Sequence, residues 1–320
     1  MKKVLKKIGI VLLILIILFI LFVLISYINH KIQLGKEDEL FNNSIGEMVE
    51  VNGHLMNVYC EGKGDKTLVF MSGGGTCSPV LDFKSLYSLL SDSYRVVVIE
   101  KAGYGFSEVV DVDRDIDTVL SETRQALKLS GIEGPYVLCP HSMSGIEALY
   151  WAQIYPEEVT AIVGLDMAVP QAYENYNISM LPVRFASAAA NTGIIRWFPS
   201  FSESDAIKYG TLSEEEKELY RTIFYRRTAT ETMLIEIEEI KSSAKKVMAD
   251  GAPTVPILMF LSNGQNTGWD EITWRGFQKN YIQSCKSGTL VELNCSHYVH
   301  DIEYEKIAKE IKTYMTNLQK

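Results

Sequence analysis

The chain has 320 residues, of which 47% are hydrophobic and 22% charged, a composition typical of globular proteins and not of disordered ones. Its formal net charge of -9 is unevenly distributed: residues 1–36 contain six lysines and no Asp or Glu, whereas the rest contains 25 basic and 40 acidic residues, a net charge of -15. Such an acidic domain argues against nucleic acid as a partner, since contacts with a phosphate backbone need clustered Lys and Arg.

Four lysines and a long apolar run open the chain. Every residue from Ile8 to Ile25 is apolar or Gly, and Tyr27 and Ile28 extend the run to the roughly 20 residues needed to cross a bilayer. A cleaved signal peptide would have about 7 to 15 apolar residues and then a small-x-small cleavage site, which the following SYINHKIQLGKE lacks. We therefore predict an uncleaved signal anchor over residues 1–28 and a polar linker over residues 29–46.

The charges beside this run predict its orientation. Lysines precede the run, whereas Glu37, Asp38 and Glu39 follow it, which favours a cytoplasmic N-terminus and an exported C-terminal domain. The predicted location is the cell membrane, crossed once.

The cysteines give no sign of a metal site. None of the five (Cys60, Cys77, Cys139, Cys285 and Cys295) belongs to a C-x-x-C pair, so neither a zinc site nor a thioredoxin-like motif is indicated. Nothing in the sequence implies a cofactor. The odd number leaves at least one thiol free, and a bridge between Cys60 and Cys77 in an oxidising exterior remains open.

Beyond residue 46, short β-branched and apolar runs alternate with longer amphipathic stretches, which predicts an α/β fold with a mostly parallel sheet covered by helices. An opening hairpin, 47–51 and 54–60, surrounds the turn dipeptide Asn52-Gly53. Six further strands are expected at 67–71, 95–100, 136–140, 160–165, 257–261 and 289–293. Helical patterns occupy about 79–91, 115–130, 143–154, 271–283 and 303–317.

Residues 170–250 interrupt this alternation with helical periodicity and no convincing strand, so we predict a helical insertion between two core segments, 47–169 and 251–320. Its charged stretches are typical of solvated helix faces. A functional alternative is a cap that shapes access to an active site.

Ser142 is the candidate nucleophile. In YVLCPHSMSGIEALYWA a buried strand runs into a tight turn and then an apolar helix, which is the context of a nucleophile elbow. The strained turn favours small residues two before and two after the serine, and these positions are Pro140 and Ser144 instead of the usual glycines, with Gly145 following. Ser144 itself lacks the strand-to-helix position. An ordinary serine at a helix N-terminus would explain the location equally well, but not the features below.

Two further segments fit a serine nucleophile. The strand 67–71 ends in Ser-Gly-Gly-Gly, and we assign the backbone N–H groups of Gly74 and Met143 to an oxyanion hole. A glycine run alone is more often a flexible loop, and no G-K-[ST] follows that would indicate phosphate binding. After the last strand comes His297, which we prefer to His300 as the general base because imidazole titrates near neutral pH.

These motifs together resemble the α/β-hydrolase superfamily: SGGG after the third strand, EKAGYGFSE after the fourth, PHSMSG at the elbow and SHYVH after the last. The resemblance covers about residues 47–317 and implies an eight-stranded α/β-hydrolase fold. EKAGYGFS is similar to the D-R-x-G-x-G-x-S segment of that superfamily. NVYCEGKGDKTLVFMSGGG and GPYVLCPHSMSG resemble bacterial esterase- and lipase-like members of the haloperoxidase and proline-iminopeptidase branch.

The acid of the expected triad has two candidates. The loop after the seventh strand, where the superfamily often places Asp, reads SNGQNTG and holds no carboxylate. Asp270 lies a few residues further but also suits the start of a helix. Asp166 follows the sixth strand, a position that supplies the acid in members such as haloalkane dehalogenases, and is preferred. Dehalogenation itself is disfavoured, because that chemistry has Asp in place of Ser at the elbow.

The sequence therefore predicts a membrane-anchored serine hydrolase of a small acyl substrate, with a carboxylic ester as the first choice of bond and an aminopeptidase-like amide as the second. The alternative from another class is a surface binding or regulatory protein that keeps the fold without catalysis, as the two missing elbow glycines and the acid-free loop suggest. No feature indicates an oligomeric state.

Overall fold

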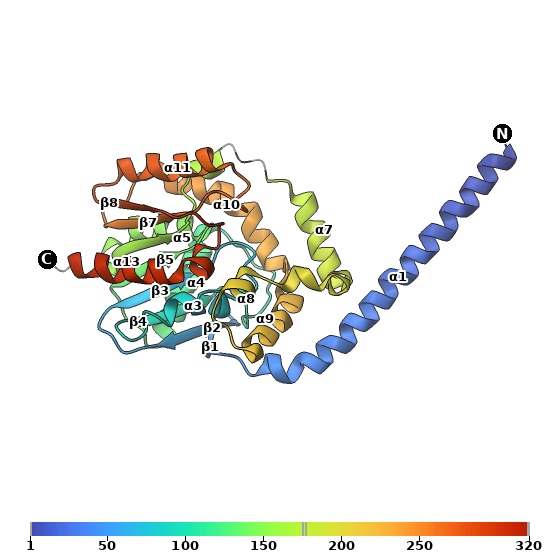
Figure 1. Cartoon of the computed structure of the whole chain (residues 1–320), viewed down its shortest axis with the longest axis horizontal. Coiled ribbons are helices and arrows are strands. Elements are labelled where there is room, and N and C mark those ends of the chain that lie inside the picture. Colours follow the sequence, from blue (N-terminus) through green and yellow to red (C-terminus); the bar gives the residue numbers. More distant parts are fainter. Residues whose placement is uncertain (1, 175, 177, 319–320) are drawn as a thin grey trace.

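A computed structural model describes residues 2–174, 176 and 178–318. Its centre is one eight-stranded sheet with the strand order β1-β2-β4-β3-β5-β6-β7-β8 (Figure 1). The strands are β1 (Glu47–Val51), β2 (His54–Glu61), β3 (Thr67–Met71), β4 (Arg95–Glu100), β5 (Tyr136–Pro140), β6 (Val159–Leu165), β7 (Ile257–Leu261) and β8 (Gly288–Glu292). The predicted mostly parallel sheet is confirmed, with strand ends displaced by one residue at most.

The sheet is parallel except at one edge. The hairpin of β1 and β2 is antiparallel, and β2 pairs antiparallel with β4, whereas all other pairs are parallel. All residues of β3, β5 and β7 are buried, as expected for strands covered by helices on both faces. Because parallel strands end at the same edge, the residues that follow β3, β5, β6 and β7 meet there.

Helices cover both faces of the sheet. One face packs against α4 (Ile116–Leu129), α5 (Ser144–Ile154), α10 (Glu231–Ala249) and α11 (Glu271–Ser284). The other packs against α2 (Pro79–Asp82), α3 (Lys84–Tyr87) and α13 (Tyr304–Asn317). The single helix expected at about 79–91 is thus two short helices, because Phe83, with a ψ of -4°, turns the backbone between them and buries its ring. The short α12 (Val299–Ile302) precedes α13.

The predicted helical insertion is confirmed between β6 and β7. It contains α6 (Gln171–Glu174), α7 (Met180–Asn191), the 3-10 turns η2 (Ile194–Trp197) and η3 (Pro199–Ser202), α8 (Asp205–Tyr209), α9 (Glu214–Arg227) and α10. We call this insertion the cap. A capping box of Ser213 and Glu216 begins α9.

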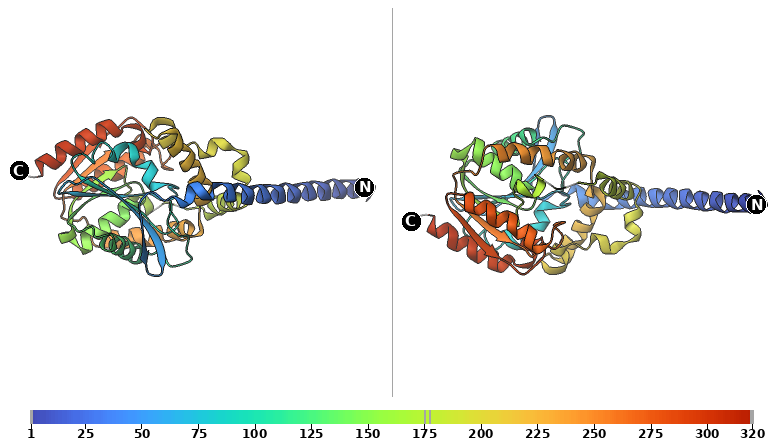
Figure 2. Two further views of the ribbon diagram at one scale, coloured as in Figure 1. Left: turned by 90° about the horizontal axis from the view of Figure 1, so that it is seen from below. Right: turned by 90° about the horizontal axis from the view of Figure 1, so that it is seen from above.

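The first helix is longer than expected. α1 (Lys2–Asn42) contains the whole apolar run and continues through most of the predicted linker. The continuation is helical because its side chains have partners on the cap: the carboxylate of Glu37 pairs with Arg196, and Asp38 pairs with Arg226. With a rise of 1.5 Å per residue, the 41 residues of α1 make about 60 Å of helix. It projects from the body at the end opposite the C-terminus (Figure 2). Its first part is apolar enough to cross a membrane.

The cysteines are all free thiols. The bridge between Cys60 and Cys77 that the sequence left open is absent, because Cys60 is exposed on β2 whereas Cys77 is buried after β3. Burial raises the pKa of the Cys77 thiol to about 12, so it stays protonated at neutral pH.

The packing of α5 at the edge where the strands end can be tested at its glycine, Gly145, with Gly276 of α11 as the comparison. A Cβ added to Gly145 would collide with the carbonyl oxygen of Ala168, whereas a Cβ at Gly276 in α11 would have no atom within 4 Å. We expect Gly145→Ala to lower the free energy of unfolding by about 1–3 kcal/mol, the usual cost of overpacking. Gly276→Ala should raise it by about 0.5–1 kcal/mol, because Ala suits a helix interior better than Gly. Urea unfolding of both variants measures the difference, and equal stabilities would contradict this packing.

Candidate active site

Ser142 lies on the turn between β5 and α5, where the backbone reverses sharply. Its φ of 53° is in the left-handed region, which a serine adopts only under strain. The loop after β3 must leave room for this turn: a Cβ at Gly73 would lie 2.6 Å from the Cβ of Ser142. The predicted elbow geometry is therefore present, and Gly73 is one of the residues that permit it.

The two departures from the glycine pattern fit this turn. Ser144 is buried, and its hydroxyl lies 2.6 Å from the carbonyl oxygen of Met71 and 2.9 Å from that of His141, so its polar atom is satisfied. Pro140 is the last residue of β5 and pairs in register with Met71. Ser144 thus fastens the turn to β3, where a glycine would leave it free.

His297 connects Ser142 to Asp166. Its Nε2 lies 2.8 Å from the Oγ of Ser142, and its Nδ1 lies 2.6 Å from Oδ2 of Asp166. The neutral tautomer that suits both contacts donates from Nδ1 to the carboxylate and accepts at Nε2 from the hydroxyl. The imidazole is 8% exposed, and the indole of Trp274 meets it edge-on with 5.7 Å between ring centroids.

Asp166 is fully buried directly after β6, and its φ of 50° turns it toward the loops that follow β7 and β8. Oδ1 accepts hydrogen bonds from the backbone N–H of Ser262, at 2.7 Å, and from the indole N–H of Trp274, at 2.9 Å. A buried carboxylate needs such donors, because removing a charge from water is costly. The loop after β7 therefore supplies a donor to Asp166 instead of a carboxylate of its own.

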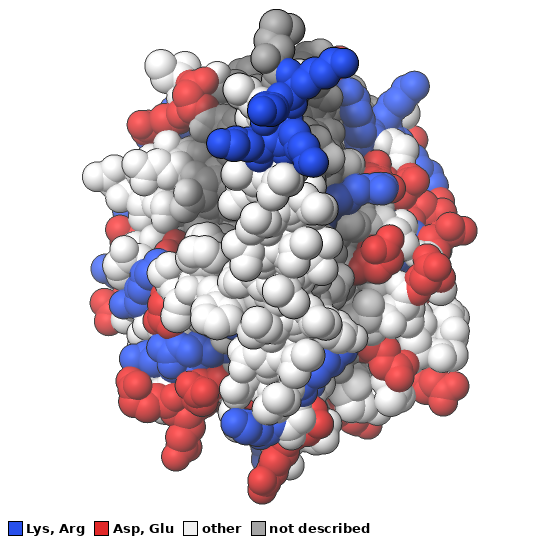
Figure 3. Space-filling view, turned by 90° about the vertical axis from the view of Figure 1, so that its right-hand side faces the viewer, with Lys and Arg blue, Asp and Glu red and all other residues white. Residues whose placement is uncertain are grey.

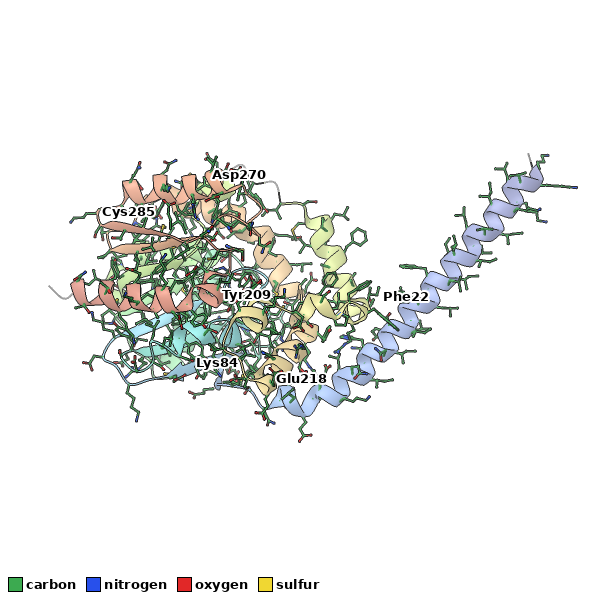
Figure 4. The ribbon with its side chains drawn as sticks, viewed as in Figure 1. Phe22, Lys84, Tyr209, Glu218, Asp270 and Cys285 are labelled. Carbon is green, nitrogen blue, oxygen red and sulfur yellow. The ribbon has the colours of Figure 1, made fainter. Side chains whose placement is uncertain are left out.

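The second acid candidate, Asp270, lies elsewhere. Its carboxylate accepts from the backbone N–H and the hydroxyl of Thr273, at 3.0 and 2.7 Å, and so caps α11. It stands at the exposed start of that helix (Figure 4). Of the two acids weighed from the sequence, only Asp166 contacts His297 in the described part of the chain.

His300 also differs from His297. It is 1% exposed, stacks 4.6 Å from the ring of Phe83, and neither ring nitrogen has a hydrogen-bond partner among the described residues. Burial lowers the pKa of His300 to about 3. His141, buried between the two, also has its pKa held well below the ordinary value by burial and by the neighbouring His297. Both rings are therefore neutral and serve as packing for the loop that carries His297.

The two amides assigned to an oxyanion hole flank Ser142. Met143 precedes the first turn of α5, and Gly74 is close enough that an added Cβ would lie 2.9 Å from its side-chain methyl. Neither backbone N–H donates to another group in residues 2–174, 176 and 178–318. The assignment of these two amides to an oxyanion hole stays a prediction.

A cavity of about 200 Å³ lies in front of these groups. Its wall contains Gly74, Ser142 and His297 together with five aromatic side chains, Tyr173, Tyr176, Trp269, Trp274 and Tyr298. No Asp, Glu, Lys or Arg is among the described residues that line it. Tyr173 and Tyr176 come from the cap, so the cap closes one side of the cavity.

Comparison with known proteins identifies the family. The family described as "alpha/beta hydrolase fold" matches residues 66–279. "Uncharacterized protein YbdG" of Bacillus subtilis (strain 168) is 36% identical over 326 residues, covering 100% of both chains. The structure of haloalkane dehalogenase DbeA from Bradyrhizobium elkani USDA94 has a TM-score of 0.66 at 18% identity, covering 85% of this chain and 98% of its own. The structure of the enol-lactonase from Burkholderia xenovorans LB400 has a TM-score of 0.63 at 16% identity, covering 84% of this chain and 100% of its own.

The fold is that of the α/β hydrolases. The chain belongs to the alpha/beta hydrolase fold family.

Several residues that support the site were not found from the sequence. Trp274 and the N–H of Ser262 hold Asp166, but nothing in a helical tryptophan or a loop serine signals this contact. Lys101 and Tyr104, within the EKAGYGFS segment, both bond to Glu236 of α10, the latter at 2.7 Å. The EKAGYGFS segment therefore also connects the core to the cap. A lysine directly after a buried strand is a sequence signal that could have predicted such an ion pair.

Buried acids lie behind the loop of His297. Asp82 and Asp301 are both 0% exposed, and burial together with the neighbouring Asp205 raises the pKa of each, that of Asp82 to about 8. The hydroxyl of Tyr220 donates to Oδ1 of Asp82 at 3.0 Å. These carboxyls are protonated in the folded protein at pH values where they would be ionised in the unfolded chain.

This linkage predicts a loss of stability at high pH. A carboxyl whose pKa is higher in the folded than in the unfolded protein favours the fold fully below its unfolded pKa, which is about 4 for Asp. This contribution to stability is lost as the pH rises toward and through the folded pKa of about 8. The melting temperature should therefore fall between about pH 5 and 8. In Asp82→Asn the fall should be several degrees smaller, because the amide keeps an acceptor for Tyr220 and does not ionise. Thermal melts against pH test this, with the exposed Asp111→Asn as control; identical pH slopes in all three proteins would refute it.

Proposed function

We propose that the chain is a membrane-anchored serine hydrolase that cleaves a carboxylic ester of a small acyl substrate. Ser142 is the proposed nucleophile, His297 the general base and Asp166 the acid that orients the imidazole. The observation that carries the proposal is the continuous hydrogen-bonded series from the Ser142 hydroxyl through both nitrogens of His297 to the buried Asp166 carboxylate, at 2.8 and 2.6 Å.

In the acylation step, the Oγ of Ser142 attacks the substrate carbonyl carbon while its proton passes to Nε2 of His297. The carbonyl oxygen becomes an oxyanion, for which the N–H groups of Gly74 and Met143 are the proposed donors. The imidazolium, stabilised by Asp166, returns its proton to the alcohol oxygen as the C–O bond breaks. An acyl-Ser142 intermediate remains.

In the second step, water attacks the acyl carbon while His297 again accepts a proton. Collapse of the tetrahedral intermediate returns that proton to the Oγ of Ser142 and releases a carboxylic acid. The cycle restores the enzyme and uses only water as co-substrate, so no cofactor enters the proposal.

The wall of the cavity favours an ester over an aminopeptidase-like substrate. A free α-amino group is a cation, and its binding would call for a carboxylate facing the cavity. The described wall residues are aromatic or uncharged, and Asp166 is turned toward His297, Ser262 and Trp274. This lining suits an uncharged acyl group.

The proposed topology places the catalytic domain outside the cell. α1 contains an apolar run long enough to cross a membrane, and four lysines lie before this run. Basic residues are retained on the cytoplasmic side of a span. Figure 3 looks at the molecule from the side of α1, where the basic side chains gather at the free end of the helix and an uncharged column follows.

Covalent labelling tests the nucleophile. The full-length protein in detergent or lipid should react with a fluorophosphonate probe, and Ser142→Ala should lose the label and at least about 10³-fold of ester turnover. The exposed Ser200→Ala is the control and should label normally. If a folded wild-type protein neither labels nor hydrolyses esters, the chain is better described as a binding protein that has kept the fold.

A pair of isosteric substitutions tests the acid. Asp166→Asn should lower kcat on the order of 10³–10⁴-fold, because the amide favours the wrong imidazole tautomer and cannot stabilise imidazolium. Asp270→Asn removes only a helix cap that Asn also provides, so turnover should be nearly unchanged. Ester kinetics at matched folded fractions, checked by thermal melting, separate the two. Similar losses in both variants would contradict the assignment of Asp166.

A further inference from the structure

Exposed aromatic side chains gather on one part of the cap. Outside α1, every exposed Phe or Trp among the described residues lies between positions 185 and 201. Together with an exposed leucine they form what we call the apolar cap face: Leu181, Phe185, Trp197, Phe198 and Phe201. Phe185 is 66% and Phe201 61% exposed. A group of rings that are each more than half exposed is unusual on a protein surface in water and is typical of a surface that binds a partner.

The same stretch is poor in charge. Residues 178–202 contain no Asp or Glu and only two basic residues, Arg184 and Arg196. Each is paired outside the stretch: Arg184 contacts Glu238, and Arg196 makes two hydrogen bonds to Glu37, at 2.7 and 2.8 Å. The apolar cap face therefore carries almost no uncompensated charge, although the domain as a whole is acidic.

Contacts with α1 fix the height of this face along the helix. The ring of Trp197 lies 5.8 Å from that of Phe22, and its indole N–H donates to the hydroxyl of Ser26 at 2.7 Å. The backbone approaches α1 so closely at Gly193 that a Cβ there would collide with His30. Phe22 is labelled in Figure 4 on the part of α1 beside the cap.

Phe22 belongs to the apolar run that ends at Ile28. With a helical rise of 1.5 Å per residue, Phe22 lies about 9 Å inside the end of that run. Amphipathic segments that lie in a membrane interface bury their apolar face by about 5–10 Å, and tryptophan is enriched at this depth. Trp197 is therefore held at the level where lipid headgroups meet acyl chains if α1 crosses the bilayer.

We propose that the apolar cap face is embedded in the outer lipid interface of the membrane that α1 crosses. The inference rests on the membrane anchor of the proposed function and adds a second lipid contact, made by the cap. The occupant is lipid rather than a second copy of the chain because the face is continuous with the span through Phe22 and Trp197. The cap, which forms one wall of the candidate active site, is then held at the bilayer surface.

Tryptophan fluorescence in lipid nanodiscs tests the proposal with the full-length chain. In a Trp197→Phe background, Phe185→Trp and Phe201→Trp each add one reporter to the native Trp151, Trp269 and Trp274. The control is Leu89→Trp, an exposed position beside α13, and α13 ends at the C-terminus, opposite α1 (Figure 1). Lipids brominated in the upper acyl chain should quench the added emission at 185 and 201 by about twofold and leave that at 89 unchanged.

Equal quenching at 185, 201 and 89 would overturn the inference. Unquenched but blue-shifted emission in particles of doubled protein mass would also overturn it, in favour of a second copy on this face. Failure of the anchor would be seen separately, as protein released from the lipid by alkaline carbonate. Failure of the catalytic proposal would be seen in fluorophosphonate labelling of Ser142, which none of these variants touches.

Discussion

The fully buried carboxylate of Asp166 is surrounded by three polar groups from different parts of the chain. Oδ2 faces Nδ1 of His297, and Oδ1 faces the N–H of Ser262 and the indole of Trp274. These donors come from the loops after β8 and β7 and from α11. The strand order that places β6, β7 and β8 side by side brings them to one edge. Loss of that order would leave an unpaired buried charge, which costs several kcal/mol.

A second buried network joins the core to the cap. Glu100, at the end of β4, is fully buried, and its carboxylate accepts from the backbone N–H of Phe106 at 2.7 Å. Burial raises its pKa to about 7, and the loop that folds around it carries Lys101 and Tyr104 to Glu236 of α10. The helix that bears Glu236 also packs against the sheet. The position of the cap, and with it the cavity wall, is thus set by ionisable groups on the strand-to-loop junction after β4.

The strands were predictable from sequence because local pattern and tertiary burial agree. The five-residue runs of β3 and β7 are apolar throughout, as strands covered on both faces must be, and their ends match the expected ones. The predictions from sequence were wrong where a contact with a distant residue determines the local backbone structure. The helix of residues 29–42 depends on cations of the cap, and the break at Phe83 depends on a ring buried between elements, neither of which a local pattern contains.

The predictions for the candidate site also divide into those that depend on local sequence and those that depend on distant contacts. The strand-turn-helix context identified Ser142, and chain order identified His297, because both signals lie within a few residues of a strand end. The choice between Asp166 and Asp270 stayed open because it depends on which loop faces the imidazole, a property of strand order rather than of either residue. The supporting roles of Ser144 and Trp274 were not predicted for a related reason: their polar atoms bond to groups on other elements, at Met71 and Asp166.

The docking of α1 on the cap gives the membrane segment a structural part in the proposed enzyme. A flexible linker would let the catalytic domain sample many orientations over the bilayer. A continuous helix clamped by Arg196, with its guanidinium shared between Glu37 and His30, allows far fewer. Trp197 adjoins Arg196, so the contacts with α1 lie on the same cap that forms one wall of the cavity. If α1 crosses the bilayer as proposed, the docked helix and the domain together limit how the candidate site is oriented over the membrane.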